Sequence, residues 1–286
     1  MLDLFVFRPF RFQELYPKDY LPWPKARSGH RIVCDEKSMF SFGGYNPFLI
    51  DNDLIDDQVW QEHKPLFKEL WKYNFAAREW TRLNIENLPK ELASNAVLLK
   101  GSTLIIYGGT GVPFGSRCSN HVHILNMRKD NKMSLIKVEG NLPQKLYGQA
   151  IALDENAHLY TMGGTTGYEY TSDIHRLDLR TSKWEDMYIC HGDENEPEGR
   201  YRHEIILYDK KLWVLGGGTA NSVNGFKVNI PMVFMYNIST SFTPFCNKSR
   251  RRDLSQPASR PSKIKYNKSL VISNELDKQI TLKSFE

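Results

Sequence analysis

The chain has 286 residues, of which 41% are hydrophobic and 12% aromatic, a composition that excludes a wholly disordered protein. Its net charge of +5 comes from residues 246–286, where ten Lys and Arg residues stand against four acidic ones, so residues 1–245 are close to neutral. The four cysteines are well separated, which argues against a disulfide framework. The sequence has no apolar run of about 18 residues, which argues against a membrane span. Because it also shows no signal-peptide pattern, we predict a cytoplasmic or nuclear protein.

Residues 1–26 form an N-terminal leader before the first of four similar units. The first unit, 27–83, opens with RSGH and continues through the apolar strands RIVC, MFSF and LWKYN to a fourth strand marked by Trp80. The same order recurs near 91–137, 144–188 and 199–245. Each second strand ends in a pair of glycines: Gly43-Gly44, Gly108-Gly109, Gly163-Gly164 and Gly216-Gly217.

Glycine pairs spaced by 65, 55 and 53 residues are typical of a β-propeller with four strands in each blade. Neither GxGxxG nor a P-loop pattern is present, so we assign the glycines to the architecture and not to a phosphate site. Trp80 and Trp184 are predicted to pack over the outer strands, whereas Thr243 takes that place in the fourth unit. We therefore expect an all-β fold with four recognisable blades.

Residues 246–286 contain no glycine pair and no R-x-G-H motif. Their Pro, Ser and basic content predicts a disordered tail, and the apolar residues near its end are too few to make further blades. The run KSRRR at 248–252 is consistent with a nuclear import signal as well as with a solvated tail. Aromatic residues are scarce there, so we expect no specific nucleic-acid partner.

The R-x-G-H motif at Arg27, the glycine-ended strands and the later Trp resemble the kelch-repeat family, from Arg27 to about Phe245. The phrases ARSGHR, FGGYNP, ELWKYNF, YGGTGVPFG and YRHEI resemble in particular the kelch substrate receptors of cullin-2 ubiquitin ligases. This resemblance implies six blades, a helical segment that docks elongin B/C and cullin-2, and a pocket for the C-terminal end of a client. We find neither a fifth blade nor a docking segment, so we expect a product truncated after the fourth repeat and less stable than a six-bladed relative.

Strand direction alternates within a blade, so the loop before the first strand and the loop after the glycine pair are predicted to share one face. That face carries cations, hydroxyls and aromatic rings, which suit a carboxylate or an acidic peptide. The candidate peptide-binding residues are Arg27, Lys145, Tyr147, Thr165, Thr166, Arg200, Tyr201, Arg202 and His203. The Arg and His of R-x-G-H can instead tie blades together by hydrogen bonds, and this alternative stays open.

Three other groups of residues are weaker candidates for a metal or catalytic site. The acidic stretch 51–62 fails the calcium-loop template because Asp56 stands where glycine is required. His121 and His123 lack a second ligand pair for a metal, and the adjacent Cys190 and His191 are badly placed for nucleophile and base. We therefore expect no metal, no cofactor and no catalytic residue.

The resulting hypothesis is a non-enzymatic kelch propeller that recognises the C-terminal ends of client proteins for a cullin-2 RING E3 ligase. A truncated form that is unable to dock the ligase stays open within this hypothesis. The alternative is a scaffold or cytoskeletal interaction module that recruits no ligase.

Overall fold

The computed structural model describes residues 21–49, 57–192 and 196–219, together with the backbone of three further strands. Its contacts divide the chain into two units, Met1–Cys246 and Asn247–Glu286. The second unit contributes an antiparallel pair, β17 (Leu270–Asn274) and β18 (Lys278–Leu282). The remainder of the predicted disordered tail lies outside the described residues.

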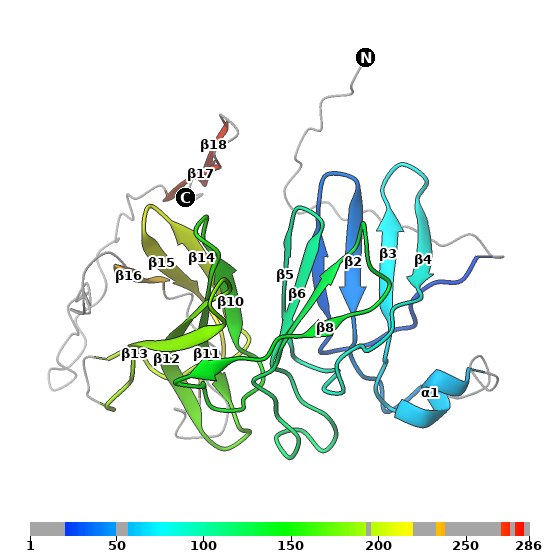
Figure 1. Cartoon of the computed structure of the whole chain (residues 1–286), viewed down its shortest axis with the longest axis horizontal. Helices are drawn as coiled ribbons and strands as arrows, with labels where there is room; N and C mark the ends of the chain where they lie inside the picture. Colours follow the sequence, from blue (N-terminus) through cyan, green and yellow to red (C-terminus); the bar gives the residue numbers. More distant parts are fainter. Residues whose placement is uncertain are drawn as a thin grey trace, which may run out of the picture. The chain divides into compact units, whose positions relative to one another are not determined.

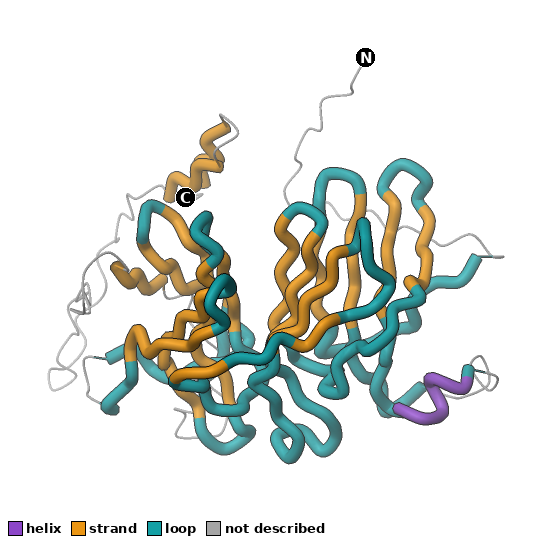
Figure 2. Tube along the Cα trace, viewed as in Figure 1, coloured by secondary structure: helices purple, strands orange, loops and turns teal. Residues whose placement is uncertain are grey.

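The described strands of the first unit form four sheets, and strands make up most of its described regular structure (Figure 2). In blade 1 the strands pair in chain order: β1 (Arg31–Cys34), β2 (Ser38–Phe42), β3 (Leu70–Asn74) and β4 (Glu79–Leu83). All three pairings are antiparallel, as a meander with short turns requires. The predicted strands of this unit are confirmed.

Blade 2 repeats the meander with β5 (Ala96–Lys100), β6 (Thr103–Tyr107), β7 (Val122–Asn126) and a short β8 (Ser134–Leu135). Glu86 and Lys132 form a parallel bridge, which attaches the segment after blade 1 to the outer edge of blade 2. Only two residues belong to β8, and neither is buried.

Blade 3 contains β10 (Ala150–Leu153), β11 (His158–Thr165), β12 (Tyr170–Asp178) and β13 (Lys183–Tyr188). A fifth strand, β9 (Glu139–Gly140), pairs in parallel with β13. The segments before blades 2 and 3 therefore extend the outer edge of the blade that follows, which the sequence pattern did not predict.

Blade 4 consists of β14 (Glu204–Tyr208), β15 (Lys211–Leu215) and β16 (Val233–Asn237), again antiparallel and in chain order. The predicted fourth strand near Thr243 falls outside the described residues. First strands of neighbouring blades lie against each other, β1 with β5, β5 with β10 and β10 with β14. This arrangement makes them the inner strands, and the all-β prediction with its blade order is confirmed.

A short helix, α1 (Gln58–His63), occupies the insertion between β2 and β3 (Figure 1). Asp57 caps it, accepting a hydrogen bond from the backbone N–H of Trp60 at 3.0 Å. The buried Trp60 ring stacks on Phe67 at 4.7 Å. The described part of the acidic stretch 51–62 thus belongs to a capped helical turn that an aromatic pair anchors.

The two tryptophans predicted to close the outer strands pack differently. Trp184 on β13 is 1% exposed, and its ring lies 5.7 Å from that of Tyr107 in blade 2. Trp80 on β4 contacts Trp71 and Tyr73 of its own blade, at 6.5 and 5.1 Å between ring centroids. Trp184 thus joins two blades, whereas Trp80 packs within one.

The glycine pair directly follows the second strand in blades 1, 2 and 4, whereas in blade 3 it lies inside β11 at a register shift between Met162 and Gly164. Gly43 has φ +64°, and a Cβ built on it would overlap the carbonyl oxygen of Leu92 in the next blade. The first glycines of the other three pairs also have positive φ values, between 63° and 66°. A left-handed backbone and the close approach of the next blade, two conditions that only glycine meets without strain, therefore both apply at Gly43.

No helix among the described residues is long and apolar enough to cross a bilayer.

Candidate functional site

The strand-leading loops (27–30, 92–95, 146–149 and 200–203) lie beside the post-glycine loops (45–49, 110–118, 165–169 and 218–219). Isolated antiparallel bridges join the two sets: Ser28 with Tyr45, Ala93 with Thr110, Tyr147 with Thr165 and Tyr201 with Gly218. The predicted shared face is confirmed, and we call it the loop face. These bridges also align the four blades, so that Arg27, Leu92, Leu146 and Arg200 occupy equivalent positions.

A chain of backbone hydrogen bonds holds the strand-leading loops of successive blades together. Ser94 N–H donates to Gly29 O at 2.7 Å, Gly148 N–H to Ser94 O at 2.8 Å, and Arg202 N–H to Gly148 O at 2.8 Å. All four residues have positive φ values, between 54° and 71°. The loop face is thus built on a backbone framework shared by all four blades.

Arg27 belongs to the framework and not to the surface. Its side chain is 4% exposed and forms an ion pair with Glu69 at 2.6 Å, while its Nη1 donates to Gly43 O at 3.2 Å. The guanidinium also lies 3.8 Å from the centre of the Phe67 ring. Burial lowers the pKa of Arg27, and the nearby Glu69 carboxylate opposes that shift. The prediction that Arg27 contacts a client is therefore wrong, because its charge is already enclosed and paired.

Arg200 repeats this arrangement in blade 4. Its Nη1 donates to Gly216 O at 3.0 Å and its Nε to Glu198 O at 3.3 Å, as Arg27 does to Gly43 and Lys25. Only 7% of Arg200 is exposed. Arg200, which was also predicted to contact a client, is thus a second structural arginine that joins a strand-leading loop to a glycine pair.

His203 lies deeper still, with 1% of its surface exposed. Burial, reinforced by the charges of Arg200 and Arg31, lowers its pKa to about 3. Its ring lies beside Gly163 of blade 3, and its Cβ lies beside Gly217 of its own blade. His203 is therefore a neutral packing residue, and its predicted contact with a client is corrected.

Two of the predicted residues on the post-glycine loop of blade 3 shape that loop. Thr165 is fully buried, and its hydroxyl donates to Glu169 O at 2.6 Å. The Thr166 hydroxyl accepts hydrogen bonds from the backbone N–H groups of Tyr168 and Glu169, at 3.3 and 3.1 Å. Thr165 cannot contact a client, whereas the partly exposed Thr166 stays a prediction.

Lys145, Tyr201 and Arg202 remain accessible on the loop face. Lys145 and Arg202 are exposed, and the Arg202 guanidinium lies 5.4 Å from the centre of the Tyr201 ring. The Tyr201 ring in turn meets that of Tyr170 edge-on at 5.4 Å. These residues place a solvent-accessible cation against aromatic walls.

Tyr147 connects this group to blade 2. It is 9% exposed, and burial raises the pKa of its phenol, with contributions from Tyr170, Cys118 and Tyr201 and an opposing one from Arg202. Its ring lies 5.9 Å from Phe114, which contacts Tyr45 of blade 1 at 4.7 Å. An aromatic row therefore crosses the loop face over three blades.

Some members of this face were not expected from the sequence. Phe114 lies in the post-glycine loop GVPFG, and Phe48 stands 89% exposed on the equivalent loop of blade 1. An aromatic residue within a few positions of each of the first three glycine pairs was the available signal. Arg31, which immediately follows R-x-G-H, was also overlooked.

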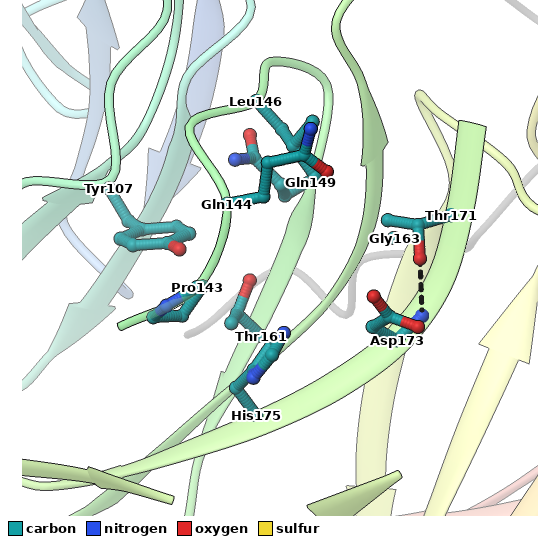
Figure 3. A pocket seen from close by; sticks show the side chains of 10 residues that line it. All are labelled: Tyr107, Pro143, Gln144, Leu146, Gln149, Thr161, Gly163, Thr171, Asp173 and His175. Carbon is teal, nitrogen blue, oxygen red and sulfur yellow. Dashed lines mark hydrogen bonds between the residues drawn. The ribbon is translucent and has the colours of Figure 1, made fainter. Parts of the chain in front are cut away.

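A small cavity lies beside the framework, between β6 of blade 2 and blade 3 (Figure 3). Tyr107, Gln149, Thr161 and His175 line it, and its volume is about 10 Å³. That is room for about one water molecule. The cavity is too small to receive a peptide end, so the exposed loop face is the better candidate site.

The metal and nucleophile candidates gain no support from their geometry. The described residues contain no cluster of three or more His, Cys, Asp or Glu side chains able to hold an ion. Burial and the neighbouring His121 lower the pKa of His123 to about 4, and the two rings lie 6.1 Å apart. Cys190 Sγ lies 3.3 Å from a carboxylate oxygen of Glu196.

Comparisons with known proteins agree with this architecture. A family model described as "KLHDC2/KLHL20/DRC7 Kelch-repeats domain" matches residues 3–217. Kelch domain-containing protein 10 of Rattus norvegicus is 41% identical over 235 residues, which are 81% of this chain and 55% of the rat protein. The Homo sapiens protein of that name is 41% identical over 219 residues, or 76% and 47% of the two chains. The Drosophila melanogaster homologue is 42% identical over 234 residues, or 78% and 37%.

The chain spans about half the length of the vertebrate relatives and 37% of the Drosophila one. Kelch domains bind partner proteins, and a loop face with accessible aromatic rings and cations suits that role. The four-stranded blades, the glycine pairs and the matched residues together show that this chain belongs to the kelch-repeat family.

Proposed function

We propose that the chain is the substrate-recognition component of a cullin-2 RING E3 ubiquitin ligase, and that its loop face binds the C-terminal ends of client proteins in the cytoplasm or nucleus. It transfers no ubiquitin itself, because that chemistry belongs to partner proteins. The observation that carries the proposal is the exposed Arg202 guanidinium set against Tyr201, within reach of Tyr147 and Tyr170.

The chemistry of this group fits a peptide terminus. A guanidinium offers paired donors that match a carboxylate, and the aromatic rings add contact area at a small cost in conformational entropy. Lys145 adds a second accessible charge immediately before the strand-leading loop of blade 3. Small terminal residues such as glycine or alanine would let the carboxylate approach the loop backbone closely.

The ligase assignment rests on the resemblance of the repeat phrases to cullin-2 receptors. Elongin B/C and cullin-2 are accordingly the proposed assembly partners. Because the chain covers only part of its relatives, ligase assembly is tested separately from client recognition.

Client recognition is tested with fluorescent peptides that end in free glycine or alanine, each paired with its C-terminal amide. We expect anisotropy titrations to detect the free acids and not the amides. The substitution Arg202→Gln should weaken binding of the acids about tenfold, the loss expected when a charge-assisted contact is removed. Equal binding of acids and amides would overturn the recognition of C-terminal ends.

Arg128→Gln is the matched control. Arg128 is also exposed, but it follows β7 at the end of blade 2 opposite the loop face, so this variant makes the same charge change away from the site. Its affinity should equal that of the wild type. A similar loss in both variants would indicate a general charge effect rather than a defined site.

Ligase assembly is tested by co-purification of elongin B/C and cullin-2 with the full 286-residue chain. Retention of both supports the receptor role. Their absence, combined with binding of free-acid peptides, would favour the alternative of an interaction module that recruits no ligase.

A further inference from the structure

The first residue of each inner strand directly follows a strand-leading loop, and these four positions are not alike. They are Arg31 on β1, Ala96 on β5, Ala150 on β10 and Glu204 on β14. Both alanines are buried. The sequence therefore places a cation and an anion at equivalent positions of blades 1 and 4, with two small residues between them in the blade order.

The two charged residues meet across the inner strands. Arg31 Nη1 donates to a carboxylate oxygen of Glu204 at 2.5 Å, although 173 residues separate them in sequence. Arg31 Nε donates to the Asn95 backbone oxygen at 2.9 Å, which fixes the direction of the guanidinium. These contacts use two of the five N–H donors of an arginine.

This ion pair differs from the one that holds Arg27. The side chains of Arg31 and Glu204 are 24% and 64% exposed, whereas those of Arg27 and Glu69 are 4% and 8% exposed. An accessible pair with one point of contact contributes little to stability, because water solvates both partners well. A second carboxylate could therefore displace Glu204 at small cost and bond to two donors of the same guanidinium.

We propose that Arg31 is a carboxylate-binding residue of the loop face, and that Glu204 is an internal carboxylate that competes with ligands for it. The inference deepens the proposed function and rests on it for the identity of the ligand. The shared chemistry is a carboxylate, which a client supplies either at its C-terminus or on an acidic side chain. A ligand therefore binds Arg31 only if its contacts with the protein are more favourable than the ion pair between Arg31 and Glu204.

The test uses the full chain and follows the Arg31 Nε–H signal by NMR while N-acetylglycine is added as the carboxylate probe. We expect the signal, assigned by its loss in Arg31→Gln, to shift with the free acid and not with N-acetylglycine amide. The variant Glu204→Gln should bind the probe about fivefold more tightly, because the competing charge is gone while the side-chain shape remains. An unchanged affinity in Glu204→Gln, or an unmoved Arg31 signal, would overturn the proposal.

Glu36→Gln is the control for net charge, since Glu36 is exposed in the β1–β2 turn at the far end of the inner strand. It should leave probe binding unchanged. A third probe, an N-acetylated peptide amide with one internal Glu, separates the two carboxylate sources. Binding of this amide as tight as that of a free-acid peptide assigns the site to acidic side chains.

The two proposals fail in different ways. If free-acid peptides bind without changing the Arg31 signal, the protein recognises C-terminal ends but Arg31 does not take part. A probe that binds at Arg31, together with client-like peptides that bind no better as acids than as amides, keeps the carboxylate site and removes C-terminal recognition.

Discussion

The strand-leading loops of blades 1 and 4 and those of blades 2 and 3 occupy equivalent places but are held in different ways. Arg27 and Arg200 reach back to the carbonyl oxygens of Gly43 and Gly216. Leu92 and Leu146, at the same positions in blades 2 and 3, are buried apolar residues. An arginine in this motif is thus a polar substitute for a core leucine, so the cations able to meet a ligand come from neighbouring positions.

The largest expected effect on stability comes from replacing Arg27 of blade 1 by leucine, the residue that blade 2 carries at the equivalent position. Arg27→Leu leaves Glu69 buried with only the 3.2 Å contact to Arg82 among its described ion pairs. Removing one partner of a buried ion pair should lower the free energy of unfolding by roughly 3–5 kcal/mol, measured by urea titration. Adding Glu69→Gln should restore part of the loss. A change of less than about 0.5 kcal/mol would show that leucine and arginine are interchangeable here.

The next effect is at the contact between the loops of blades 1 and 2. Gly43→Ala should cost about 3 kcal/mol, since it combines a left-handed backbone with overlap of the Leu92 carbonyl. Gly101→Ala is the matched variant, because Gly101 has φ +56° and no described atom within 4 Å of a built Cβ. It should cost about 1 kcal/mol by thermal unfolding. Equal losses of stability in the two variants would mean that glycine is required at position 43 by its φ angle alone and not by the contact with blade 2.

A third effect depends on pH. The pKa of His203 is lowered to about 3 in the folded protein from an ordinary value of 6.5, so the unfolded chain binds the extra proton between these values. This contribution to stability is complete above pH 6.5 and decreases as the pH falls toward 3, by up to about 1.4 kcal/mol per pH unit.

His203→Gln sharpens this test, because blade 3 carries Gln149 at the equivalent position. The variant should show a shallower loss of unfolding free energy between pH 7 and 5 than the wild type. Parallel pH curves for the two proteins would assign the acid sensitivity to other groups, such as His30, whose pKa burial also lowers.

The smallest effect concerns the exposed Lys145. Lys145→Gln should weaken binding of free-acid peptides only about twofold, because an accessible ammonium acts through screened attraction. The loss should disappear near 1 M salt, where the screening length falls to about 3 Å. A stability change in this variant would instead place Lys145 with the structural arginines.

Particular elements show which parts of the fold and of the site could be predicted from the sequence. RIVC and LWKYN coincide with β1 and β3, and the glycine pairs follow the second strands of blades 1, 2 and 4 as predicted, because strand alternation and glycine backbone freedom are local properties. In blade 3 the strand continues through the pair to Thr165. The six-residue helix α1 escaped notice, because it is too short for a hydrophobic period to show. For the site, the shared loop face was predictable, and Lys145, Tyr201 and Arg202 are accessible on it.

Sequence alone determined that this chain repeats one four-stranded unit, where its turns fall and which residues belong to one face. Only the tertiary structure decided which cations on that face are accessible. Arg27 and Arg202 lie in equivalent loops, yet the first is enclosed beside Glu69 and the second is exposed beside Tyr201. The reason is physical: the burial and pairing of a charge depend on side chains brought together by neighbouring strands and blades, as Arg31 and Glu204 are, and such contacts have no local signature.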